Sequence, residues 1–246
     1  MKKSCYMIAW AALLIVALPC RLTAEETGKQ YTVPLAEAYS GNKYLQAEVE
    51  GMSVRFIFDT GCSSVSISRS VFNTLLRRGL VKKKDLSHES EVELANGASH
   101  KVKHFVIKHL RVGDCVLHNV HATVSMDASS EGGSLFGQAA LERMAYYSVA
   151  GNTLYFESKP EGEQHALYLA ELLSDDTARV QQQRIVDALQ PYAEWLTPRY
   201  LLIYAYALYR TGEYEQAIGI FRYLIDSGVF EDNDRQLRKA LEKIGE

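Results

Sequence analysis

Asp59 is the residue of this sequence whose surroundings best suit chemistry. It follows the apolar run 56–58 and is followed by Thr60 and Gly61. Hydrolysis of a peptide by water needs a base and an acid, and two facing carboxylates that share one proton supply both. A carboxylate in this role must leave a buried strand on a tight turn, which the apolar run and the permissive backbone of Gly61 allow. Because the Thr60 hydroxyl can hydrogen-bond across a symmetric pair of loops, we predict that Asp59, Thr60 and Gly61 are catalytic.

Asp226 is the other candidate for the second carboxylate. Two apolar residues precede it and Ser227 and Gly228 follow it, as in the run around Asp59. However, residues 217–224 have a helical pattern, and Ser227 and Gly228 have the residue types of a C-terminal helix cap. Only 18 residues remain after Gly228, too few for the other elements of a second lobe. We therefore interpret Asp226 as structural and expect the second carboxylate to be Asp59 of another copy, brought in by a twofold interface.

The elements that must position Asp59 are predicted to be mostly β-strands between residues 31 and 157. Alternating apolar residues are separated there by turn residues, which is typical of short strands and hairpins. The expected strands cover residues 44–49, 54–58, 91–94, 101–110, 116–124 and 154–156, with turns at 50–51, 96–97 and 113–114. Helices are expected at 70–78, closed by Gly79, and at 138–144.

Three features then follow one another in the order of a known family. The Asp-Thr-Gly run at 59–61 follows a hairpin with the turn 49–51, and a second hairpin has its tip at Ala95, Asn96, Gly97 and Ala98. Further along, Leu135, Phe136 and Gly137 introduce a helix that ends near Arg143. In this order, across residues 44–157, the sequence resembles a bacterial member of the retropepsin-like aspartic proteases.

The resemblance implies a closed β-barrel, the acid protease lobe, and an aspartic-type endopeptidase that acts on peptide or protein substrates. It implies that the hairpin tip 95–98 is a flap that binds substrate, and that Gly137 supports the catalytic loop. The active form is expected to be a homodimer with an Asp59 pair at its centre. No metal and no cofactor is expected.

Cys62 departs from the family pattern, in which Ala or Ser commonly follows the Asp-Thr-Gly. A Ser there can donate to the carboxylate and lower its pKa, whereas a thiol is a weak donor. We therefore expect a pH optimum in the mildly acidic to neutral range. A small buried filler is the favoured role of Cys62, with oxidation or pairing with Cys115 as the alternative. Ser63 and Ser64 are expected to support the loop through side-chain to backbone hydrogen bonds.

The pattern changes from strands to helices near residue 158. Pro160 and Gly162 indicate a linker at 159–164, and helices are expected at 165–173, 176–189 and 232–244. Small and aromatic residues in 201–224 have the spacing of a helix-turn-helix pair and resemble one tetratricopeptide repeat. The predicted domains are therefore a protease domain at 25–158 and a small all-α, tetratricopeptide-like module at 165–246. Whether this module packs on the protease or contacts another protein is left open.

The first 24 residues have the pattern of a secretory signal. Lys2 and Lys3 precede an apolar run from Tyr6 to Leu18, and a small-residue boundary ends at Ala24. The run is shorter than the roughly 20 residues of a membrane span, so cleavage is favoured over a retained anchor. We expect the protein to be exported, periplasmic or secreted.

Composition and charge exclude several function classes. The net charge is −3, and residues 1–24 contain three basic and no acidic residues, so signal removal makes the chain more acidic. This balance argues against nucleic-acid binding. The histidines are scattered without the spacing of a metal site. The alternative function is a catalytically inactive module that binds a peptide or a partner protein through the β domain and the helical tail.

Overall fold

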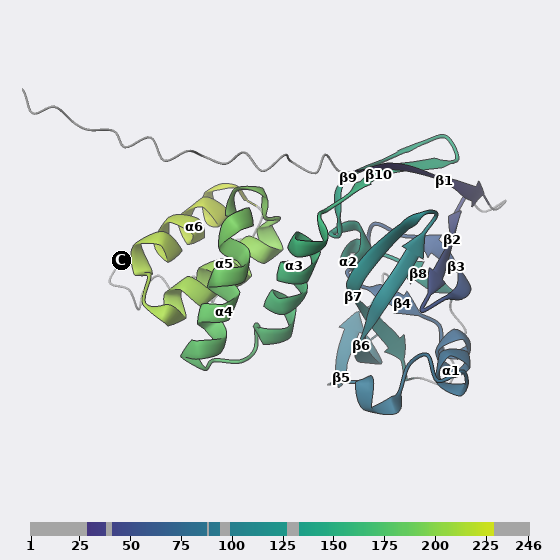
Figure 1. The fold of residues 1–246 in the computed structure, drawn as a ribbon, viewed down its shortest axis with the longest axis horizontal. Coiled ribbons are helices and arrows are strands. Elements are labelled where there is room, and N and C mark those ends of the chain that lie inside the picture. Colours follow the sequence, from purple (N-terminus) through teal and green to yellow (C-terminus); the bar gives the residue numbers. More distant parts are fainter. Residues whose placement is uncertain (1–28, 38–40, 88, 94–98, 127–132, 229–246) are drawn as a thin grey trace, which may run out of the picture.

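The protein was analysed as a computed structural model that describes residues 29–37, 41–87, 89–93, 99–126 and 133–228. The signal predicted at 1–24, the last helix predicted at 232–244 and the flap residues Ala95, Asn96, Gly97 and Ala98 lie outside these residues. The described chain consists of a β-rich part followed by a helical region, and Figure 1 shows the two side by side with α3 next to the barrel.

Six strands of the β-rich part close into a barrel. They pair in the order β6, β7, β4, β8, β3 and β2, and β2 pairs again with β6. The six are β2 (Lys43–Val49), β3 (Met52–Phe58), β4 (Val65–Ile67), β6 (Ser99–Val112), β7 (Cys115–Ser125) and β8 (Ser134–Phe136). The predicted closed barrel is thereby confirmed.

The hairpin that leads to Asp59 follows from its sequence. Every second residue of β3 from Met52 to Phe56 is buried, which is the two-residue period of a strand with one face on a core. Glu50 and Gly51 both have positive φ, 49° and 80°, as the central residues of a tight hairpin turn require. The Glu50 carboxylate accepts the Lys108 N–H at 2.6 Å, which secures this turn against β6.

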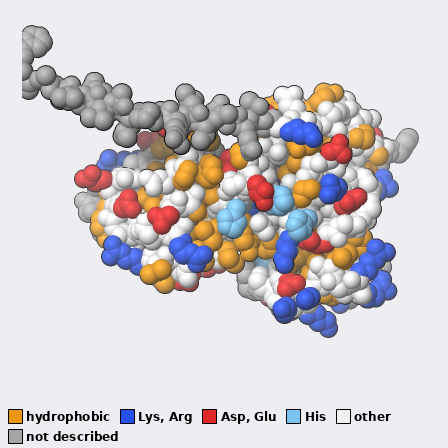
Figure 2. Space-filling model, viewed as in Figure 1, with side chains coloured by type: hydrophobic (Ala, Val, Ile, Leu, Met, Phe, Trp, Pro, Cys, Tyr) orange, Lys and Arg blue, Asp and Glu red, His pale blue; other side chains and the backbone are white. Residues whose placement is uncertain are grey.

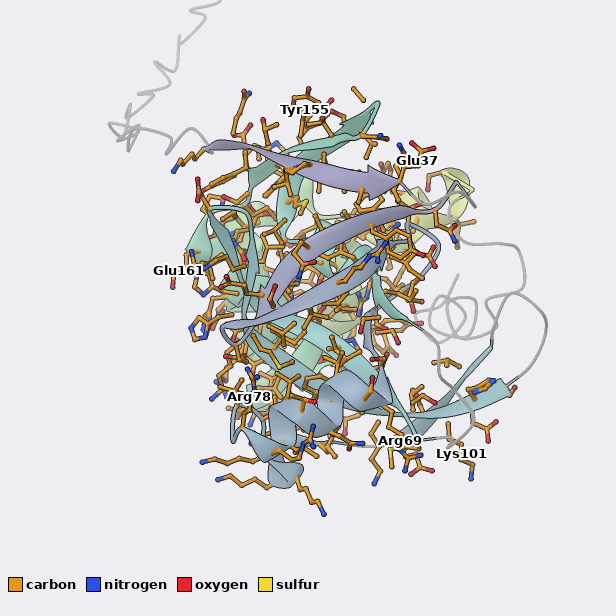
Figure 3. The ribbon with its side chains drawn as sticks, turned by 90° about the vertical axis from the view of Figure 1, so that its right-hand side faces the viewer. Glu37, Arg69, Arg78, Lys101, Tyr155 and Glu161 are labelled. Atoms are coloured by element: carbon orange, nitrogen blue, oxygen red, sulfur yellow. The ribbon has the colours of Figure 1, made fainter. Side chains whose placement is uncertain are left out.

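A further antiparallel layer extends the sheet beyond β2. β1 (Gln30–Glu37) pairs with β2 through its last three residues and with β10 (Thr153–Ser158) through its first five, and β10 pairs with β9 (Met144–Ala150). These three strands lie above the barrel in Figure 1. In Figure 3, Tyr155 lies on this layer, at the opposite end of the view from Arg78, the C-cap residue of α1.

Short helical elements complete the β-rich part. α1 (Arg69–Arg77) begins after Ser68, whose hydroxyl caps the Val71 N–H, and Gly79 follows it with φ 71°, close to the predicted bounds. The remaining elements are η1 (Lys83–Asp85), the edge strand β5 (Glu89–Glu93) and α2 (Gln138–Leu141). α2 is three residues shorter at its C-terminal end than the predicted helix 138–144.

The helical region is a series of helices that pack on their sequence neighbours. Its elements are α3 (Glu161–Leu173), α4 (Arg179–Leu189), η2 (Gln190–Trp195), α5 (Pro198–Thr211) and α6 (Tyr214–Asp226). Their apolar faces form a second core, separate from that of the barrel. Gly212 ends α5 with φ 99°, the left-handed conformation that suits a helix end. No helix among the described residues is long and apolar enough to cross a membrane.

The segment predicted as a linker, 159–164, is mostly helix. α3 begins at Glu161, directly after Pro160 with ψ 146°. Proline breaks a helix interior but suits a helix start, and the acidic residues of the first turn favour the positive end of the helix dipole. Gly162 lies in that first turn, where a Cβ atom would lie 3.2 Å from the Tyr192 hydroxyl. Proline and glycine therefore indicated the start of a helix, not a loop.

Candidate active site

Asp59 lies where β3 ends and the chain turns. β3 runs parallel to β8, with Phe58 opposite Phe136, and the two rings stack at 6.1 Å. The Asp59 N–H donates to the Phe136 carbonyl at 3.0 Å, so the ladder continues into the first residue of the turn. The backbone at Asp59 is thus fixed by a neighbouring strand, although the residue follows the last position of β3.

Backbone N–H groups of the turn that carries Asp59 bond to Asp59 itself. The Gly61 N–H donates to Asp59 Oδ1 at 2.9 Å, and the Cys62 N–H donates to the Asp59 carbonyl at 3.3 Å. Asp59 is partly exposed, while Thr60 and Gly61 are exposed. The structure therefore brings the three predicted catalytic residues onto one accessible turn, with one oxygen of the carboxylate held.

Gly137 and Gln138 support this turn from the start of α2. The Gln138 N–H donates to the Cys62 carbonyl at 2.7 Å, and the Gln138 side-chain amide donates to the Thr60 carbonyl at 2.6 Å. A Cβ atom at Gly137 would lie 2.2 Å from the Ser64 carbonyl oxygen and 2.3 Å from that of Cys62, closer than atoms can approach. Gly137 therefore has to be glycine because the carbonyl groups of Cys62 and Ser64 leave no room for a side chain, and not because of its backbone conformation.

The Cys62 thiol forms a hydrogen bond within its own loop. It donates to the Ser64 carbonyl at 3.2 Å. Burial raises the pKa of this thiol, the Ser64 hydrogen bond opposes the rise, and the negative charge of Asp59 adds to it. Cys62 and Cys115 are both free thiols. The sequence favoured a small buried filler, whereas Cys62 is half-buried and bonded within its own loop.

Ser64, rather than Ser63, makes the stronger anchor of the loop. Ser63 is exposed, whereas Ser64 is buried and its hydroxyl lies 2.9 Å from the Thr123 hydroxyl on β7. The contact joins two side chains, while the sequence suggested bonds from side chain to backbone. Thr123 could not be linked to Ser64 from the sequence, because 59 residues separate the two.

Asp226 occupies the position that the helical interpretation predicts. It is the last residue of α6, Ser227 is the C-cap, and Gly228 follows with φ 66°. Its side chain is exposed at a helix end and does not follow a strand of the sheet. Among the described residues, the turn at 59–61 is thus the one Asp-Thr-Gly or Asp-Ser-Gly run that leaves a strand.

Histidines line the outer faces of the β6–β7 hairpin. Their neighbours alternate between buried and exposed positions, as predicted for strand faces. His104 Nδ1 and His121 Nε2 lie 2.8 Å apart, and the rings of His109 and His118 meet edge to face at 5.8 Å. Figure 2 shows histidine side chains (pale blue) gathered on the face in view. Over the described ranges, no group of three or more His, Cys, Asp or Glu could hold a metal ion.

Comparison with known proteins finds one family model that matches a segment of the β-rich part. Residues 45–143 match the family model described as "gag-polyprotein putative aspartyl protease". No curated protein matches the chain.

Two solved structures are similar to part of the chain. A retropepsin-like aspartic protease from Rickettsia conorii is 20% identical with a TM-score of 0.39, over 52% of this chain and 98% of its own. The EIAV protease in complex with the inhibitor HBY-793 is 8% identical with a TM-score of 0.31, over 42% of this chain and 86% of its own. The match to the aspartyl protease family model thus covers residues 45–143, less than half of the chain, and ends before the helical region.

Proposed function

We propose that the protein is an endopeptidase that hydrolyses peptide bonds with a pair of Asp59 carboxylates, one from each of two copies of the chain. The observation that carries the proposal is the Asp59 turn itself, an accessible carboxylate fixed at the end of β3 and held by the Gly61 N–H at 2.9 Å. Thr60 and Gly61 are exposed beside it, which suits a face that meets an identical turn. The family match of residues 45–143 supports the same chemistry.

The proposed reaction uses the two carboxyl groups in different protonation states. Two like charges about 3 Å apart cannot both ionise, so one proton is shared and the apparent pKa values belong to the pair. The ionised carboxylate takes a proton from water as the water oxygen attacks the peptide carbonyl carbon, while the protonated one hydrogen-bonds to the carbonyl oxygen. Collapse of the tetrahedral intermediate then breaks the C–N bond, and the carboxyl group that took the proton from water gives it to the leaving amine nitrogen, which restores the shared single proton of the pair.

A twofold homodimer is proposed because one chain supplies half of this site. Asp226 ends helix α6 and so does not offer a second turn of the same kind. A twofold axis places the same residue of each copy at the interface, which brings two Asp59 side chains together. The substrate class is peptide or protein, and export is proposed from the signal pattern in residues 1–24.

The helical region is proposed to be tetratricopeptide-like. α5 and α6 form a helix pair that turns at Gly212, and Ala205 and Ala217 are buried in it. Close packing of small residues between paired helices is typical of such repeats.

The decisive variant is Asp59→Asn, and Asp226→Asn is its matched control. Each change removes the aspartate carboxylate from one of the two similar runs. We expect Asp59→Asn to abolish cleavage of a peptide library while circular dichroism and the unfolding temperature stay as in the wild type. Asp226→Asn should cleave like the wild type. Cleavage retained by Asp59→Asn would overturn the proposal. A wild-type monomer that cleaves no peptide would favour the inactive binding module instead.

A further inference from the structure

Five side chains from both parts of the chain meet beside α2, and we name them the α2 anchor: Glu142, Arg143, Glu171, Arg199 and Tyr200. Arg143 donates to the Tyr200 hydroxyl and to the Glu171 carboxylate, each at 2.8 Å. The Tyr200 hydroxyl donates to the other Glu171 oxygen at 2.5 Å. Arg199 donates to Glu142 at 2.8 Å. The helical region therefore holds both residues that directly follow α2.

Burial makes the geometry of the α2 anchor well defined. Arg143 and Tyr200 are both 0% exposed. Burial alone would lower the pKa of Arg143, but Tyr200 and Glu171 outweigh it and raise the pKa, so the guanidinium stays charged. In contrast, burial raises the pKa of Tyr200, so its hydroxyl stays protonated and remains a hydrogen-bond donor. Loss of one partner would leave a buried charge with unmet bonds, which is costly.

The opposite end of α2 supports the catalytic turn. α2 has only four residues, and its start is fixed by Gln138 on the Thr60 and Cys62 carbonyls. Ala139, Ala140 and Leu141 between the two ends are buried in the barrel core. A buried single-turn helix has little room to bend, since packed interiors transmit displacements rather than absorb them. A shift at Arg143 is therefore expected to move Gln138 and, with it, the turn at 59–61.

We propose that Tyr200, Glu171 and Arg199 of the helical region are positioning residues for the Asp59 turn and act on it through α2. The helical region then sets the geometry of the catalytic turn, besides packing on the barrel. The effect on catalysis rests on the proposed protease function. The effect on the structure of the turn does not, because Cys62 reports on the turn through its thiol, which is half-buried against Ser64.

The test compares two variants of the full chain that each remove one buried hydroxyl from α5. Tyr200→Phe removes a hydroxyl of the α2 anchor, whereas Thr211→Val removes one that bonds only to carbonyls of α5. Alkylation by N-ethylmaleimide is followed separately at Cys62 and Cys115 by peptide mass spectrometry. Cys115 is 2% exposed within the barrel and therefore reports global unfolding. Arg199→Gln, at a half-exposed position of the anchor, is the second variant if Tyr200→Phe does not fold.

Local opening of the turn should make Cys62 of Tyr200→Phe react about threefold faster than in Thr211→Val, with Cys115 unchanged. In cleavage assays kcat should fall with KM nearly constant, since the turn and not a substrate pocket is displaced. Equal Cys62 rates in the two variants, or equal acceleration at Cys62 and Cys115, would overturn the inference. If the wild type cleaves nothing, the Cys62 rates still decide it, and only the proposed protease function fails.

Discussion

The side-chain amide of Gln138 donates a hydrogen bond to the Thr60 carbonyl over 2.6 Å, so the first residue of α2 holds the turn that carries Asp59. Gln138→Ala should lower kcat about tenfold, because the turn loses a direct restraint, while stability changes by about 1 kcal/mol. The measurements are steady-state cleavage and chemical denaturation. Gln183→Ala, which removes an amide with an exposed hydrogen bond to Asp187 of α4, is the control. A kcat loss no larger than that of the control would contradict the role of Gln138.

Gly137 and Gly219 offer a matched pair of glycine-to-alanine changes. A Cβ at Gly137 would lie 2.2 Å from the Ser64 carbonyl oxygen, whereas one at Gly219 of α6 would meet nothing within 4 Å. Gly137→Ala should lower the free energy of unfolding by about 3 kcal/mol or more. Gly219→Ala should raise it by up to about 1 kcal/mol, the helix preference for Ala over Gly. Denaturant titrations measure both, and an unchanged stability of Gly137→Ala would refute the close packing.

Glu142 should make stability depend on pH. Burial raises the pKa of this carboxyl group in the folded protein, and Arg199 offsets the rise only in part. The folded state therefore keeps a proton where the unfolded chain has lost it, so this contribution is fully present below the ordinary Glu range and disappears as pH rises through the raised pKa.

The check is denaturation across that pH range for the wild type, Glu142→Gln and Glu48→Gln. Glu142→Gln should remove the decline in stability, because the group no longer titrates. Glu48→Gln, which removes an exposed carboxylate paired with Arg111, should keep it. A decline that persists unchanged in Glu142→Gln would assign the effect to another group.

Cys62 should react slowly with alkylating reagents at neutral pH. Burial and the charge of Asp59 raise the pKa of its thiol, and the thiolate is the reactive form. The alkylation rate at Cys62 should therefore be lower than that of a free small thiol at pH 7 and should rise at higher pH. Asp59→Asn should increase the rate, since it removes the negative neighbour. A Cys62 that reacts faster than the free thiol at pH 7 would contradict this environment.

The elements near Asp59 could be predicted because their signals are local. An apolar strand, a turn with Glu50 and Gly51, and the run 59–61 each depend on a few consecutive residues. β4 was not predicted, since its three residues are too few to show alternation. The helix expected at 138–144 stops at Leu141, and Met144 already begins β9.

The contacts that hold the site could not be predicted from the sequence. Arg143 meets Glu171 and Tyr200 across 28 and 57 positions of the chain, and no motif connects them. Ser64 and Thr123 are likewise joined only by the parallel pairing of β4 and β7. Such partners depend on the closed barrel and on the packing of α3 and α5 beside it. The turn at 59–61 could be predicted from local sequence patterns, whereas the residues that hold it in place come together only in the tertiary structure.

The central claim, that two copies each supply one Asp59, is tested most directly by mixing wild-type chains with Asp59→Asn chains. The two are combined in equal amounts, subunits are allowed to exchange, and cleavage is compared with that of the wild type at the same total concentration. If both carboxylates are required, only wild-type pairs work, and about one quarter of the activity should remain. About one half, the result for chains that act independently, would contradict the account.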